Sequence, residues 1–284
     1  MSIWPPSLVT ELAERRAVIF IGAGISKAAK SEMPSWPKLL TDMSAHITTK
    51  KDKKLTDKLI KNGRLLDAAE LISSLVLPAD RRSILENQFK IKPEPISEIY
   101  SDILSLDQKI CITTNYDQFI EKNFEHFSGT GVSHQVRLYT YKKILSDIRS
   151  PSRILIKLHG CISDPPDIVL DKRSYFKAKS ENPGIYETIK ALCTLNTVLF
   201  LGYSMNDPDI QLILEDINAV SSTEHRHFAL VPKFEHPSLR EANSQTYNIN
   251  FIEYANGRHD LVPKYINELR SSVESTRASY GTRI

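Results

Sequence analysis

The chain has 284 residues, a length that fits one large domain or two small ones. Of these residues 41% are hydrophobic and 25% charged, a composition typical of folded rather than disordered chains. Its formal net charge of +3 comes from 37 basic and 34 acidic residues, a balance too even to indicate binding to membranes or directly to nucleic acid. The longest apolar stretch is far shorter than the roughly 20 residues of a membrane helix, and the N-terminus lacks the features of a signal peptide, so we expect a cytoplasmic protein.

The three cysteines, Cys111, Cys161 and Cys193, are odd in number and lie far apart, and no Cys-x-x-Cys pair occurs. A zinc ribbon needs four closely spaced ligands, and a disulfide framework needs paired cysteines. We therefore expect reduced, largely buried thiols and no bound metal.

The first predicted elements are a helix from Ser7, its expected cap, to about Arg16, and a strand at 17–21. The strand is a continuous apolar run, typical of a strand that is buried on both faces of a parallel sheet. From 36 to about 105 the apolar residues repeat at helical spacing, which predicts a helical module. The lysine-rich run 50–54 is expected between two of its helices as a solvated surface, with a basic contact patch as the alternative.

Strands and helices alternate after this module. Strands are predicted at 109–113, 153–158, 197–201, 227–231 and 248–254, and helices at 117–124, 184–195, 207–220 and 260–273, with a short helix before the last strand. This alternation predicts an α/β fold with a parallel sheet covered by helices on both faces. The polar segment 271–284 is expected to be a frayed tail. Because no Gly/Ser-rich linker divides the chain, we expect a single domain over residues 1–284.

A glycine turn, Gly22-Ala23-Gly24, directly follows the first strand. Such a turn lets main chain approach a pyrophosphate at a helix N-terminus, although it can also be no more than a tight connection. A third glycine would fall at Lys27, and no acidic residue ends a second strand about 20 residues later. A Gly-Lys-Ser/Thr phosphate loop is missing as well. These departures exclude the common dehydrogenase and P-loop patterns.

Four of the predicted strands carry suggestive residues at their ends. The four sets are Gly22 to Gly24, Thr113 to Asp117, Leu158 to Gly160, and Gly202 to Asp209. Each set alone is explained by a helix cap or a turn. Because the carboxyl ends of parallel strands meet at one edge of the sheet, the four sets together predict a ligand site there.

In order and spacing these segments resemble the bacterial sirtuin-like family found in anti-phage defence. The resemblance rests on Gly-Ala-Gly-Ile-Ser, Thr-Thr-Asn-Tyr-Asp, Lys-Leu-His-Gly and Phe-Leu-Gly-Tyr-Ser-x-x-Asp-Pro-Asp, and it runs from about Val18 to Asp209, more loosely to Leu269. The segment Pro34-Ser35-Trp36 also resembles this branch rather than the protein deacetylases. The resemblance implies a Rossmann-like sheet with an inserted helical module, no zinc ribbon, and NAD as the substrate.

The resemblance also assigns site residues. The catalytic set is Asn115, Asp117 and His159, and the glutamine of the family's Gln-Asn-Ile-Asp motif is replaced by Thr114. The cofactor-binding set contains Gly22, Ala23, Gly24 and Ser26 for the pyrophosphate, together with Thr113, Asn115, Asp117, Gly202, Ser204 and Asp207.

The chemistry of these side chains suits cleavage of the nicotinamide–ribose bond. Nicotinamide leaves as a neutral molecule and needs no general acid, so an orienting amide (Asn115) and a base (His159) are sufficient. The implied reaction is hydrolysis of NAD to ADP-ribose and nicotinamide. A protein deacylase or ADP-ribosyltransferase is the first alternative, and a non-catalytic NAD or ADP-ribose sensor is the second. The missing zinc-ribbon cysteines favour water as the acceptor.

An unrestrained NAD hydrolase would poison its own cell. The resemblance therefore implies an effector of abortive infection that is held off until a signal arrives. It implies a homo-oligomer, and a separate sensor protein such as an ATPase, an Argonaute-like protein or a nucleotide-handling protein.

Overall fold

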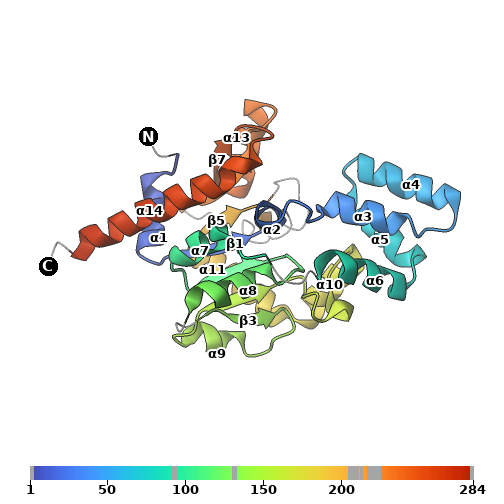
Figure 1. The fold of residues 1–284 in the computed structure, drawn as a ribbon, viewed down its shortest axis with the longest axis horizontal. Helices are drawn as coiled ribbons and strands as arrows, with labels where there is room; N and C mark the ends of the chain where they lie inside the picture. The colour runs from blue at the N-terminus through green and yellow to red at the C-terminus, as the bar shows by residue number, and fades with distance from the viewer. Residues whose placement is uncertain are drawn as a thin grey trace.

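The computed structural model describes residues 3–90, 95–129, 133–203, 211, 214–215 and 225–281. Its centre is a sheet of seven parallel strands in the order β3-β4-β2-β1-β5-β6-β7 (Figure 1). The strands are β1 (Ala17–Ile21), β2 (Ile110–Thr113), β3 (Gln135–Leu138), β4 (Ile154–Lys157), β5 (Thr197–Leu201), β6 (His227–Pro232) and β7 (Ile249–Tyr254). The expected α/β fold with a parallel sheet is confirmed.

The strand order places a topological switch between β1 and β5. From β1 the chain builds one half of the sheet with β2, β3 and β4, and it then returns to the other side of β1 with β5, β6 and β7. In the register of the sheet, Ile21 pairs with Thr113 on one side and with Leu201 on the other. The turns that follow β1, β2 and β5 therefore begin at the same level, at the place where open parallel sheets bind ligands.

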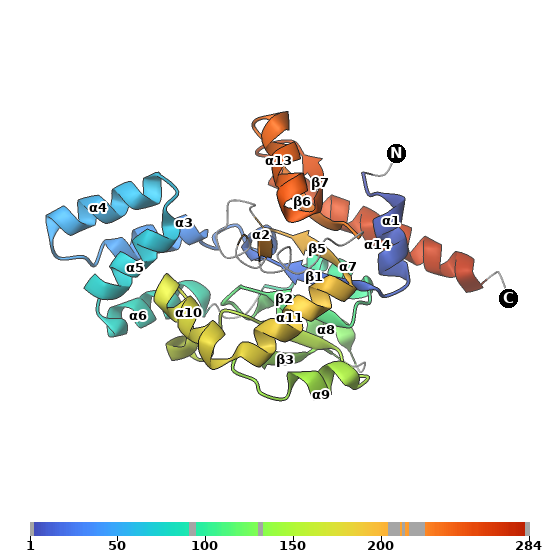
Figure 2. The same ribbon diagram turned by 180° about the vertical axis from the view of Figure 1, so that it is seen from behind.

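Helices cover both faces of the sheet, as expected (Figures 1 and 2). Alternate residues of β1 enter different cores: Ile19 and Ile21 pack in one hydrophobic cluster, and Val18 and Phe20 in the other. The first cluster includes buried residues of α1 (Pro6–Ala13), α7 (Glu98–Ser105), α8 (Phe119–Ser128) and α14 (Val262–Gly281). The second includes buried residues of α9 (Ile144–Arg149), α10 (Lys172–Glu181) and α11 (Pro183–Leu195).

A helical module extends from the sheet between β1 and β2 (Figure 1). After α2 (Ala23–Ala29) it consists of α3 (Trp36–Ser44), α4 (Lys50–Lys61), α5 (Leu65–Leu75) and α6 (Pro78–Phe89). One contact of the module with the rest of the molecule is at α10, where Lys172 forms an ion pair of 2.5 Å with Asp67. The last helix within the expected range 36–105, α7, packs against α8 and α14 in the core.

Four further predictions need correction. The first helix begins at Pro6 with Pro5 as its N-cap residue, so Ser7 is not the cap, and it ends at Ala13, shortly before Arg15 adopts a φ of 59°. Residues 50–54 do not separate two helices but form the start of α4. The helix predicted from Asp117 starts at Phe119. The tail expected from 271 is helical to Gly281, because Val273 is buried and Arg277 binds core carbonyl groups.

One helix and two short turns remain to be described. The short helix before the last strand is α13 (Pro237–Tyr247), and two short turns, η1 (Pro165–Asp167) and η2 (His259–Leu261), follow β4 and β7.

The strand β3 and the helices α9 and α10 were not predicted. The helix predicted at 207–220 falls largely outside the described residues. Within the described part of the chain, no helix is both long and apolar enough to span a membrane.

Candidate active site

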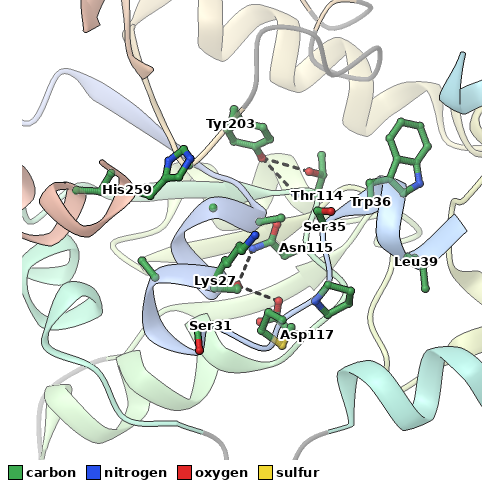
Figure 3. Close-up of a pocket in the computed structure, with 18 of the residues that line it drawn as sticks. Lys27, Ser31, Ser35, Trp36, Leu39, Thr114, Asn115, Asp117, Tyr203 and His259 are labelled. Atoms are coloured by element: carbon green, nitrogen blue, oxygen red, sulfur yellow. Dashed lines mark hydrogen bonds between the residues drawn. The ribbon is translucent and has the colours of Figure 1, made fainter. Parts of the chain in front are cut away.

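A cavity of about 810 Å³ lies beyond the carboxyl ends of the strands, within the size range of small-molecule sites (Figure 3). Residues from both halves of the sheet line it, and so do residues of the helical module. The predicted site residues that line it are Ala23, Gly24, Ser26, Asn115, Asp117, His159 and Gly202. The structure therefore brings most of the predicted set together in one pocket.

Ser26 connects the two turns that follow β1 and β2. Its hydroxyl donates a hydrogen bond of 2.9 Å to Oδ2 of Asp117 and accepts one of 3.0 Å from Nδ2 of Asn115. The hydroxyl of Tyr100 on α7 lies 3.3 Å from the same oxygen. Figure 3 shows the two hydrogen bonds as dashed lines. Because Nδ2 of Asn115 faces Ser26, the orientation of its side-chain amide is fixed before any ligand binds.

Asp117 is buried, with only 2% of its surface exposed. Its Oδ1 accepts the main-chain N–H of Phe119 at 3.0 Å, so it also helps to start α8. Burial raises the pKa of Asp117 above its ordinary value, although nearby Lys157 acts in the opposite direction. The site thus contains a carboxyl group whose charged form is disfavoured by burial, and such groups are common in active sites.

His159 reaches the cavity from the end of β4 and is 2% exposed. Its carbonyl oxygen accepts the N–H of Val169 at 3.0 Å, and its ring lies edge to face with Tyr175 at 6.5 Å. The next residue, Gly160, has a φ of 80°, and a Cβ there would lie 2.5 Å from the carbonyl oxygen of Asp167. The glycine therefore permits the sharp turn that holds the imidazole in place.

The glycines after β1 and β5 touch each other through their main chains. The N–H of Gly24 donates to the carbonyl oxygen of Gly202 at 2.9 Å, and a Cβ on Gly24 would lie 2.8 Å from that oxygen. Gly22 does not line the cavity; its N–H donates to Leu201, and a Cβ on it would lie 2.6 Å from the same Gly202 oxygen. Close approach of the two turns is therefore one reason for glycine at all three positions.

Thr113 does not line the cavity either. It is fully buried, and its hydroxyl donates to the carbonyl oxygen of Ile21 at 2.6 Å while accepting the N–H of Asn115 at 3.0 Å. It therefore holds β1 and β2 together below the Asn115 turn. Thr114, which stands where the family motif has glutamine, lines the cavity and donates to the hydroxyl of Tyr203. Ser204 and Asp207, also predicted to bind the dinucleotide, lie outside the described residues.

Several lining residues were missed from the sequence. One group comes from α2 and the helical module: Lys27, Trp36, Leu39, Leu65 and Phe89. Another lies at the carboxyl ends of β6 and β7 and in η2: Pro232, Tyr254, His259 and Asp260. The second group could have been predicted from the sequence, because β6 and β7 were predicted and the carboxyl ends of parallel strands lie at the same edge of the sheet.

The cysteines are buried and unpaired, as expected. Burial raises the pKa of Cys111 and of Cys193 to about 12, so neither is a reactive thiolate at neutral pH. None of the three lines the cavity.

A family model described as a SIR2-like domain matches residues 109–252, just over half of the chain. The chain belongs to the SIR2-like family. The expected resemblance to sirtuin-like proteins is therefore confirmed.

Curated relatives of the chain carry the name NAD(+) hydrolase ThsA. The protein from Enterococcus faecium is 31% identical over 220 residues, which are 76% of this chain and 43% of that protein. The protein from Bacillus cereus (strain MSX-D12) is 27% identical over 79% of this chain and 45% of its own length. Defense-associated sirtuin 2 of Bacillus subtilis is 24% identical over 70% of this chain and 19% of its own length. The chain thus spans less than half the length of these relatives.

A solved structure described as "Structural Basis for the Mechanism and Regulation of Sir2 Enzymes" aligns over 96% of this chain and 97% of its own. The TM-score is 0.48 and the sequence identity is 14%.

Proposed function

We propose that this chain hydrolyses the nicotinamide–ribose bond of NAD, giving ADP-ribose and nicotinamide. The observation that carries the proposal is the hydrogen-bonded group of Ser26, Asn115 and Asp117, which lines one cavity together with His159 and Gly24. The names of the ThsA relatives support NAD as the substrate.

The cavity of about 810 Å³ is lined by residues from both halves of the sheet. Asn115, Asp117 and His159 lie over β2 and β4, and the glycine contact of Gly24 with Gly202 lies over β1 and β5. We assign the nicotinamide ribose to the first region and the diphosphate to the turns near the second. The adenosine then extends toward the carboxyl ends of β6 and β7.

In the proposed reaction the C–N bond between ribose and nicotinamide breaks, and its electron pair leaves with nicotinamide. The ribose carbon becomes cationic in the transition state, and a water oxygen bonds to it. Asn115 orients the ribose or the water, and neutral His159 accepts the proton that the water loses. The buried carboxyl group of Asp117 holds Ser26, which in turn holds Asn115.

Isotopically labelled water can test whether water is the acceptor of the ribose. The protein is incubated with NAD alone in ¹⁸O-enriched water, and the products are analysed by chromatography and mass spectrometry. The proposal expects nicotinamide and ADP-ribose in equal amounts, with one ¹⁸O in the ADP-ribose. Release of nicotinamide only when an acyl-lysine peptide or another acceptor protein is added would favour a deacylase or transferase. Binding of NAD without turnover would favour a sensor.

In the cell we propose a cytoplasmic, oligomeric effector that depletes NAD during phage infection under the control of a signal or a separate sensor protein. The defence-associated name of the Bacillus subtilis relative supports this role. Cellular NAD is measured after phage infection of bacteria that carry the gene with its native neighbours. A fall in NAD in the wild type but not in an Asn115→Ala strain is expected, and equal NAD in both strains would argue against the role.

A further inference from the structure

A lysine is fully buried below the candidate active site. Lys157 is the last residue of β4, and none of its side-chain surface is exposed. The three preceding residues of the strand, Ile154, Leu155 and Ile156, are also fully buried, and they are apolar. Placing an ammonium group in such surroundings is unfavourable unless partners compensate it, so the position calls for an explanation beyond packing.

The partners of Lys157 are a carbonyl oxygen and a carboxylate. Its Nζ donates to the main-chain oxygen of Asp117 at 2.5 Å and to Oε1 of Glu121 on α8 at 2.6 Å. Burial has the largest single effect and would lower the pKa of Lys157, but Glu121, Cys161 and Asp117 together outweigh it, and the pKa lies above its ordinary value. The ammonium group is therefore charged, and it binds the turn that carries the site residues.

The ion pair is poorly suited to stabilising the fold. Among the described residues, Oε2 of Glu121 is buried and has no hydrogen-bond partner. A buried pair with an unsatisfied oxygen commonly stabilises a protein no better than two apolar side chains of the same size. The contact that apolar side chains could not replace is the hydrogen bond from Lys157 to the carbonyl oxygen of Asp117.

That hydrogen bond joins two parts of the site. His159 follows Lys157 by two residues, and Asn115 precedes Asp117 by two residues. Asp117 in turn holds Ser26, which holds the amide of Asn115. A short path through Lys157 therefore connects the imidazole on the β4 side to the amide and the carboxyl group on the β2 side.

We propose that Lys157 is a positioning residue that fixes the spacing between His159 and the Asn115–Asp117 turn. This inference rests on the proposed function, because the spacing matters for NAD cleavage only if both groups act on NAD. Lys157 does not line the cavity, so its effect passes through these residues. A misplacement of about 1 Å in such a site lowers the rate on the order of 10²-fold.

The test uses two variants and a matched control. Lys157→Met removes the ammonium group but leaves Glu121 buried without its partner, and this variant can fail to fold. The double variant Lys157→Met/Glu121→Met leaves no buried charge at the pair and keeps similar side-chain volumes. The control is Lys109→Met: Nζ of Lys109 also donates to two main-chain carbonyl oxygens, of Ile148 and Ser150, but from the amino end of β2.

Two properties of each folded variant are measured: kcat and KM for NAD, and the NMR shifts of the His159 ring and the Asn115 side-chain amide without NAD. In the double variant we expect kcat to fall on the order of 10- to 100-fold, KM to change less than about threefold, and both sets of shifts to move. Lys109→Met should change none of these. A folded double variant with wild-type kcat would overturn the inference.

The NMR measurement separates this inference from the proposed function. A wild-type protein that releases no nicotinamide would contradict the proposed function, whatever the variants do. In that case, unchanged shifts of His159 and Asn115 in the double variant would also overturn the positioning role, whereas moved shifts would show that Lys157 sets their geometry.

Discussion

The main-chain N–H of Gly24 donates a hydrogen bond of 2.9 Å to the carbonyl oxygen of Gly202, although the two glycines follow different strands, β1 and β5. These strands flank the topological switch of the sheet, and both glycines line the cavity. In the middle of the site, the main chains of the turns after β1 and β5 therefore pack directly against each other. A side chain has no room there, which gives the glycines a structural reason besides their approach to a phosphate.

Gly202 offers a test of this contact with a matched control. It has a φ of 73°, and a Cβ on it would lie 2.6 Å from the main-chain nitrogen of Ile25. Gly63 has the same φ, but a Cβ on it would have no other atom within 4 Å. We expect Gly63→Ala to lower the free energy of unfolding by about 1–2 kcal/mol through its backbone conformation alone. Gly202→Ala should lower it further and abolish NAD binding. Equal losses of stability in urea unfolding would contradict the contact.

His159→Ala should abolish NAD cleavage and leave the fold intact, because the imidazole is the proposed base. The loss of a positioned base lowers the rate on the order of 10²–10⁴-fold. The rate of nicotinamide release measures this, and circular dichroism checks the fold. The exposed His126 on α8 is the control, and His126→Ala should keep the wild-type rate. A folded His159→Ala protein with wild-type turnover would remove His159 from the mechanism.

Asp117→Asn should separate stability from activity. Burial raises the pKa of Asp117, so the folded state favours the protonated carboxyl group. Its contribution to stability is complete at pH values below the unfolded pKa and is lost as the pH rises through the folded pKa. The stability of the asparagine variant relative to the wild type, measured by urea unfolding, should therefore rise as the pH increases through the folded pKa of Asp117. NAD cleavage should fall strongly. A relative stability of the variant that falls as the pH increases would contradict this explanation of Asp117.

Two buried histidines should make the protein sensitive to acid. Burial lowers the pKa of His134 and of His227 to about 4. The unfolded chain takes up protons near pH 6.5 and the folded protein only near pH 4, so stability is complete above about pH 6.5 and is lost as the pH falls toward 4. Each histidine contributes a slope of up to about 1.4 kcal/mol per pH unit.

The substitution His227→Gln checks this acid sensitivity. It should reduce the slope of the free energy of unfolding between pH 6 and 4.5 by about one proton, and the exposed His46→Gln should not. An unchanged slope in His227→Gln would show that His227 is not buried in its neutral form.

Arg277 should anchor the C-terminal helix. Its guanidinium group donates to the carbonyl oxygens of Leu12 at 2.8 Å, Ala13 at 3.0 Å and Leu106 at 2.8 Å, at the ends of α1 and α7. We expect Arg277→Met to lower the free energy of unfolding by about 2–3 kcal/mol, because several buried carbonyl groups lose a charged donor. Ser275→Ala, an exposed position on the same helix, should cost less than about 0.5 kcal/mol. Similar unfolding midpoints for the two variants would contradict the anchor.

The central strands could be predicted because β1 and β5 are buried on both faces and therefore read as continuous apolar runs. The edge strand β3 could not, because it is short and partly exposed and contains Gln135 and Arg137. The length of α14 was missed for a similar reason: its last turns are polar, and the carbonyl groups that Arg277 binds come from α1 and α7, which the sequence of α14 does not reveal.

The grouping of Asn115, Asp117 and His159 in one cavity followed from the rule that parallel strands end at the same edge. The contacts that order the site could not be predicted. Tyr100 reaches Ser26 from α7, and the oxygen of Gly202 meets Gly24 through main chain alone. Contacts between distant segments leave no periodic pattern, and main-chain hydrogen bonds depend little on which side chain is present.

The most direct test of the account compares NAD binding and NAD cleavage in Asn115→Ala. The dissociation constant for NAD is measured by calorimetry, and nicotinamide release is measured on the same preparation under conditions in which the wild type turns over. The account predicts that the variant binds NAD within a few fold of the wild type and releases nicotinamide at least about 10²-fold more slowly. A variant that cleaves NAD at the wild-type rate would place the reaction elsewhere in the molecule.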